Sequence, residues 1–105
     1  MIEFSKQGDV AITGTVLFTG TSGGALLSKI LTMRFNNPAA YDLKLDKYEA
    51  STSTTTTIYD LSLAAGDTVT DNLTYALNPG DQLIVTTNIV GTTYYIYGLD
   101  YAVNG

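Results

Sequence analysis

The sequence contains no cysteine and no histidine among its 105 residues. Without cysteine there are no disulfide bonds and no thiol nucleophiles, and without either residue type there is no zinc site with thiolate or imidazole ligands. A catalytic triad with a histidine base is excluded for the same reason. Carboxylates, tyrosines, lysines and hydroxyls remain for chemistry. Packing, helped by oligomerisation, must therefore stabilise the fold without covalent links.

Positive charge is also scarce. Five cationic side chains are scattered among ten acidic residues, which gives a formal net charge of −5. Phosphate groups are bound by clustered lysine or arginine, so we expect no nucleic acid and no anionic membrane surface as a partner. No apolar run approaches the roughly 18 residues of a membrane span. The N-terminal residues MIEFSKQGD lack the basic and apolar regions of a secretion signal.

Strand-forming residues are abundant, whereas strong helix formers are few; glutamate occurs only twice. Apolar and polar residues alternate with a period of two in seven segments bounded by turn signals. These segments are residues 10–19, 29–36, 41–49, 57–63, 68–77, 82–89 and 92–103. The pattern predicts an all-β protein, a single β-sandwich of seven to eight antiparallel strands with jelly-roll or Ig-like topology. We assign residues 10–105 to this domain and residues 1–9 to an N-terminal arm or a first edge strand.

Three local patterns refine this prediction. Asn78-Pro79-Gly80-Asp81 has the proline and glycine positions of a type II turn. The Ser/Thr tract at residues 51–57 predicts a loop that runs into a strand. The last segment is apolar on both faces, which is typical of a strand that is central in its sheet or covered by a neighbouring subunit.

Two groups of carboxylates are candidate calcium ligands, although neither has the spacing of a known calcium loop. Asp42 and Asp46 flank Lys44 on one strand face, and neutralisation by the lysine favours a solvated surface there. The second group would have to gather at one end of the sandwich: Asp67, Asp71 and Asp81. We predict no metal, no cofactor and no catalytic residue, because no long insertion is present to build a cleft around a carboxylate pair.

The eight tyrosines allow two interpretations, sugar stacking or packing within the core and between subunits. Packing is favoured for the six that share the apolar phase of their segments, namely Tyr41, Tyr59, Tyr75, Tyr95, Tyr97 and Tyr101. Tyr48 and Tyr94 are off this phase and are expected to be exposed. We predict that subunit contacts involve Phe4, Phe18, Tyr94 and Tyr97.

The strings LAAGDTV (residues 63–69) and YALNPGDQLIV (residues 75–85) follow an alternating strand in YDLKLDKYEA. In this succession of alternating strands and Gly-Asp turns, the chain resembles small β-sandwich virion proteins of tailed bacteriophages. The resemblance implies a capsid decoration or cement protein, or a head-fibre type, made in the host cytoplasm and located on the virion. Such a protein forms a homo-oligomer, with a trimer favoured, and attaches to the major capsid protein or another virion protein. The alternative is a carbohydrate-binding or host-adhesion module on a phage head or tail, with a glycan as partner.

Overall fold

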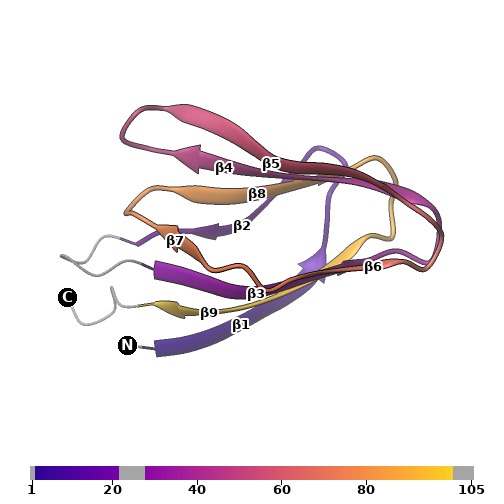
Figure 1. Cartoon of the computed structure of the whole chain (residues 1–105), viewed down its shortest axis with the longest axis horizontal. Coiled ribbons are helices and arrows are strands. Elements are labelled where there is room, and N and C mark those ends of the chain that lie inside the picture. Colours follow the sequence, from indigo (N-terminus) through magenta and orange to yellow (C-terminus); the bar gives the residue numbers. More distant parts are fainter. Residues whose placement is uncertain (1, 22–27, 101–105) are drawn as a thin grey trace.

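The computed structural model describes residues 2–21 and 28–100 (Figure 1). These residues form nine strands and no helix. The strands are β1 (Ile2–Asp9), β2 (Thr15–Thr19), β3 (Ser28–Asn36), β4 (Tyr41–Glu49), β5 (Thr54–Leu63), β6 (Thr68–Asp71), β7 (Tyr75–Leu77), β8 (Gln82–Thr87) and β9 (Thr93–Asp100). The predicted all-β class is confirmed.

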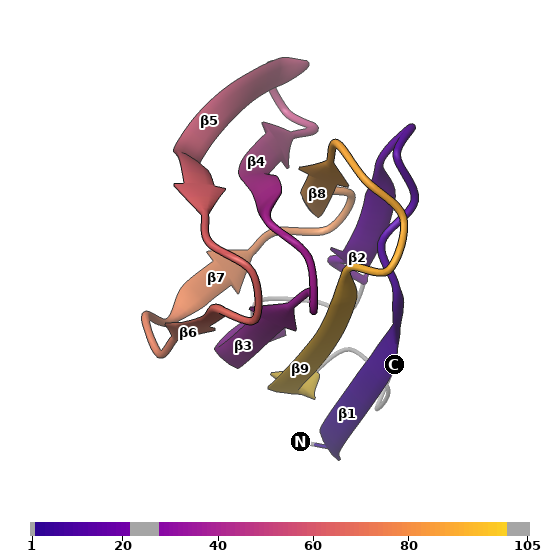
Figure 2. The ribbon, with the colours of Figure 1, turned by 90° about the vertical axis from the view of Figure 1, so that its right-hand side faces the viewer.

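The strands form two antiparallel sheets that face each other (Figure 2). The first sheet has the order β1-β9-β3-β6, with β7 also paired to β3, and the second has the order β2-β8-β4-β5. Because β6 and β7 pair with successive parts of β3, they act as one interrupted strand. The first strand then pairs with the last, the second with the last but one, and so on inwards to the β4–β5 hairpin. This nested pairing defines a jelly roll.

Residues 2–9 are not a detached arm, because β1 pairs with β9 along its whole length and forms one edge of the first sheet. The strand predicted for residues 10–19 begins only at Thr15. A turn precedes it, in which the Gly14 N–H donates to the Ala11 carbonyl at 3.0 Å and Gly14 has a φ of 104°. Residues 101–103 of the predicted last segment lie outside the described residues.

Two other local predictions are confirmed. The Asp81 N–H donates to the Asn78 carbonyl at 3.0 Å, and Gly80 has the positive φ, 88°, that a type II turn requires at its third position. The Ser/Thr tract turns after Glu49 and enters β5 at Thr54.

The core lies between the sheets and receives side chains from both. Its fully or nearly buried apolar members are Val10, Leu17, Ile30, Met33, Phe35, Tyr41, Leu43, Leu45, Leu77, Leu83, Val85, Tyr94 and Ile96. The pairing of β3 with β9 shifts register between Ile30 and Thr32, and this bulge lets Ile30 and Met33 point to the same side. Ile30 is therefore fully buried, whereas Leu31 is half-buried.

Candidate binding surfaces

Two of the predicted contact residues, Phe4 and Phe18, are brought together within the chain. Their rings stack with centroids 4.7 Å apart and planes inclined by 15°. Phe4 comes from β1 and Phe18 from β2, so the pair joins the two sheets along one side of the sandwich. Nearby, the Lys6 Nζ donates to the Leu17 carbonyl at 3.3 Å. Both rings are half-buried against the core, so most of their packing is intramolecular.

The third predicted contact residue, Tyr94, lies in the core with an exposed fraction of 8%. Its expected exposure is wrong because the phase assigned to the last strand is inverted. In β9, Tyr94 and Ile96 point inward, whereas Tyr95 points outward and is 38% exposed. The alternation of apolar and polar residues did not reveal which face of β9 points toward the core, because β9 carries large apolar side chains on both faces. As its two-sided composition indicated, β9 is central, between β1 and β3.

The remaining tyrosine predictions have different outcomes. Tyr41 is buried, and Tyr59 and Tyr75 pack half-buried against the core, as predicted. Tyr48 is half-buried rather than fully exposed. Tyr101 lies outside the described residues.

The outer side of the first sheet carries what we call the tyrosine face, made by Tyr95, Tyr97, Gln7, Thr32 and Arg34. Strand register places these residues in two rows. Tyr95 lies opposite Gln7 of β1 and Arg34 of β3, and Tyr97 lies opposite Thr32 of β3. The fourth predicted contact residue, Tyr97, is therefore on the surface, half-buried at the centre of the sheet.

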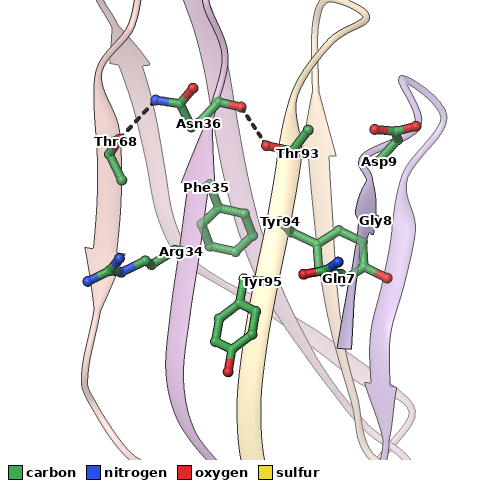
Figure 3. Close-up of a pocket in the computed structure, with 10 residues that line it drawn as sticks. All are labelled: Gln7, Gly8, Asp9, Arg34, Phe35, Asn36, Thr68, Thr93, Tyr94 and Tyr95. Atoms are coloured by element: carbon green, nitrogen blue, oxygen red, sulfur yellow. Dashed lines mark hydrogen bonds between the residues drawn. The ribbon is translucent and has the colours of Figure 1, made fainter. Parts of the chain in front are cut away.

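Two shallow hollows flank Tyr95 on this face. One has a volume of about 510 Å³ and reaches from Gln7 and Asp9 across Tyr95 to Arg34 (Figure 3). At one end of it, Asn36 donates to the Thr68 hydroxyl at 2.9 Å. The second hollow, about 480 Å³, is lined by Thr32, Arg34, Tyr95 and Tyr97. Tyr95 and Arg34 thus border both depressions.

The polar groups of the tyrosine face differ in whether they interact with other residues of the chain. Desolvation, and then the neighbouring Glu3 carboxylate, raise the pKa of Tyr97. Tyr97 therefore remains a neutral hydroxyl at physiological pH. Arg34 is exposed, and no hydrogen bond or ion pair within residues 2–21 and 28–100 engages its guanidinium. Its five N–H donors are available to a ligand.

The carboxylates considered as calcium ligands do not gather. Asp81 is buried and accepts N–H bonds from Ala50 and Asn78, each at 3.0 Å. Asp46 is buried beside the Thr57 hydroxyl at 2.7 Å, whereas Asp42 on the same strand is exposed. Within the described part of the chain, no three acidic side chains are placed to hold a metal ion.

Asp71 joins the two sheets instead. It is 7% exposed, and its carboxylate accepts hydroxyl hydrogen bonds from Tyr59 at 3.1 Å and Tyr75 at 2.7 Å. The Leu73 N–H donates to its second oxygen at 3.0 Å. Tyr59 belongs to β5 in one sheet and Tyr75 to β7 in the other, so this carboxylate stabilises the side of the sandwich opposite the phenylalanine pair.

Next to Asp71 lies a second surface, the leucine edge, made by Leu61, Val69 and Leu73. Leu73 is 67% exposed and Leu61 is 37% exposed, and both line a hollow of about 430 Å³ with Val69. The surface lies where β5 and β6 end their sheets on the same side of the molecule (Figure 2). The sequence did not reveal this surface, because Leu73 was placed inside a continuous strand. The structure instead interrupts that strand at residues 72–74.

No protein-family model matches the chain, and no match is found among curated proteins. Among the residues that the structure describes, no helix is long and apolar enough to cross a membrane. The functional argument therefore depends on the fold and on the two surfaces, the tyrosine face and the leucine edge.

Proposed function

We propose that this protein is a structural virion component, a capsid decoration or cement protein that forms homo-oligomers and attaches to the shell of a tailed bacteriophage. The sequence resemblance motivates this assignment, and the jelly roll is compatible with it because that architecture recurs in viral capsid domains. Oligomers form by burial of apolar surface at roughly 25 cal/mol per Å² and by pairing of strand edges.

The leucine edge is the observation that supports assembly. β5 is ten residues long and ends its sheet, and its sequence TTTTIYDLSL contains no lysine, arginine or proline. Those residues commonly keep edge strands from pairing with other chains, and β5 has only Asp60 and a bulge at Ile58 in their place. This long edge lies beside exposed Leu61 and Leu73. A second copy of this chain fits these features, because it would bury the leucines and pair with the free edge.

Substitution of Leu73 tests this assembly. Leu73→Asp places a charge in the proposed contact without disturbing the core, because the side chain is 67% exposed. We expect size-exclusion chromatography with light scattering to give an oligomeric mass for the wild-type chain and a monomeric mass for the variant. Val90→Asp is the matched control, since Val90 is 73% exposed in the β8–β9 connection and should remain oligomeric. A monodisperse wild-type monomer would contradict the proposal.

Attachment to a shell needs a separate measurement. Mass spectrometry of purified virions from the phage that encodes the chain should detect it in many copies per particle. Its absence from such particles would overturn the virion assignment and leave any self-assembly in place.

A carbohydrate-binding module is the second candidate function, and the tyrosine face favours it. An exposed tyrosine between two hollows, with amide, hydroxyl and guanidinium groups around it, has the mixture of an aromatic surface and a few polar groups that small-ligand sites use. This role is compatible with a place on a virion surface.

A further inference from the structure

The polar groups of the tyrosine face differ from one side of Tyr95 to the other. Toward β1 the hollow is lined by Gln7 and the Asp9 carboxylate. Toward β6, Tyr95 is followed by Arg34 and then by Thr70, which is its register partner in β6. Arg34 lies opposite Tyr95 on the neighbouring strand, and both residues line the two hollows. The Arg34 side chain extends toward β6, on the side away from the Tyr95 ring (Figure 3).

Arg34 gives this side a preference for negative charge. A planar guanidinium binds a carboxylate through two parallel hydrogen bonds, and such charge-assisted pairs are stronger than neutral ones. Within the described residues, no carboxylate forms an ion pair with the Arg34 guanidinium. The formal net charge of −5 repels an anion from the molecule as a whole, so binding would depend on this one cation.

We infer that the tyrosine face binds an acidic saccharide, such as a sialic or uronic acid, with the sugar ring on Tyr95 and the carboxylate on Arg34. Hydroxyl groups of the sugar then meet Gln7 and Asp9 on the β1 side. This inference depends on the second candidate function, carbohydrate binding, and adds the charge of the ligand. It is independent of self-assembly at the leucine edge, which lies at the far side of β6.

A glycan array with matched acidic and neutral members tests the inference. The probes are sialyllactose beside lactose, and trigalacturonic acid beside its methyl ester. We expect the wild-type chain to bind at least one acidic member and to ignore its neutral match. Tyr95→Ala should weaken that binding at least tenfold, and Arg34→Gln should abolish it. Arg34→Lys should restore only part of it, because an ammonium group cannot form the paired hydrogen bonds.

Lys44→Gln is the matched control, because it removes one positive charge from β4 in the other sheet and should leave binding unchanged. Circular dichroism of each variant checks that the fold is retained. Equal binding of acidic and neutral glycans, lost in Tyr95→Ala, would overturn the acidic preference and retain a carbohydrate-binding module. Absence of binding to every member of the array would overturn both.

Discussion

At the scale of single residues, the Asp71 carboxylate shows how a polar group can connect two sheets. It is buried, and two tyrosine hydroxyls and one backbone N–H satisfy it. A hydrogen bond to a charged group contributes about 1.5–3 kcal/mol, and a buried charge without partners is strongly unfavourable. Asp71 therefore helps to hold Tyr59 and Tyr75 in place, in addition to their apolar packing.

This arrangement predicts a loss of stability at alkaline pH. Burial, and then Asp71, raise the pKa of both Tyr59 and Tyr75 above the ordinary value of 10.0. Above about pH 10 the unfolded chain loses these protons while the folded chain keeps them, so the free energy of unfolding falls as pH rises. Below that pH the contribution is fully present. We expect urea denaturation experiments to give a free energy of unfolding that declines from about pH 10 upward.

The Tyr59→Phe/Tyr75→Phe double variant isolates this effect. It lacks both hydroxyls, so its decline above pH 10 should be shallower than that of the wild-type chain. At neutral pH it should be less stable by about 2–4 kcal/mol, because Asp71 loses two donors. If the free energy of unfolding fell equally with pH in the two proteins, the pKa values of these hydroxyls would be the same in the folded and unfolded chains, which would contradict the prediction.

Single residues also show where the sequence was informative and where it was not. Gly80 was predicted correctly, because a turn with proline at its second position requires a positive φ at the third. Tyr94 and Tyr95 were assigned to the wrong sides, because a strand with aromatic residues on both faces contains no alternation from which to read its phase. Tyr95 was consequently not named among the contact residues, whereas Tyr97, which was named, lies on the outer surface.

At the scale of elements, β1 is the strand whose role the sequence left most open. It pairs with β9 over eight residues and places Phe4 against Phe18. Gly98, the register partner of Phe4, leaves the space for this ring, since a Cβ at Gly98 would lie 2.9 Å from the Phe4 Cζ and would clash with the Lys29 carbonyl oxygen. The β1–β9 pairing is thus specified by packing between residues far apart in the sequence.

Phe4→Ala tests whether this packing lies within the chain or between subunits. We expect the variant to lose about 2 kcal/mol of unfolding free energy, less than a fully buried phenylalanine would, because Phe4 is only half-buried. Chemical denaturation at two protein concentrations, tenfold apart, should give the same loss. A loss that depends on concentration would instead place Phe4 in a subunit contact.

Other element boundaries followed from long-range contacts that a single sequence does not reveal. The seven predicted segments matched the observed strands best where alternation was strict, as in β4 and β8. They failed where the chain turns inside an apolar run. The turn before β2 and the break between β6 and β7 are of this kind. The last of these creates the leucine edge, which explains why that surface was not predicted.

At the scale of the whole molecule, the jelly roll separates the two surfaces. The tyrosine face covers the outer side of the first sheet, and the leucine edge occupies the side where β5 and β6 are the last strands of their sheets. A subunit can therefore meet a neighbour through one surface and leave the other open to solvent. The proposed self-assembly and the proposed saccharide binding therefore use different surfaces and do not compete.

Hydrogen exchange of the wild-type chain at low and high concentration tests the central claim, assembly through the leucine edge, most directly. Exchange should slow at high concentration for the backbone amides of β5 and of residues 68–73, because a second copy covers them. The amides of β1 serve as an internal control, since that strand lies at the opposite edge of its sheet. Exchange rates that do not depend on concentration, or slowing confined to β1, would contradict the account.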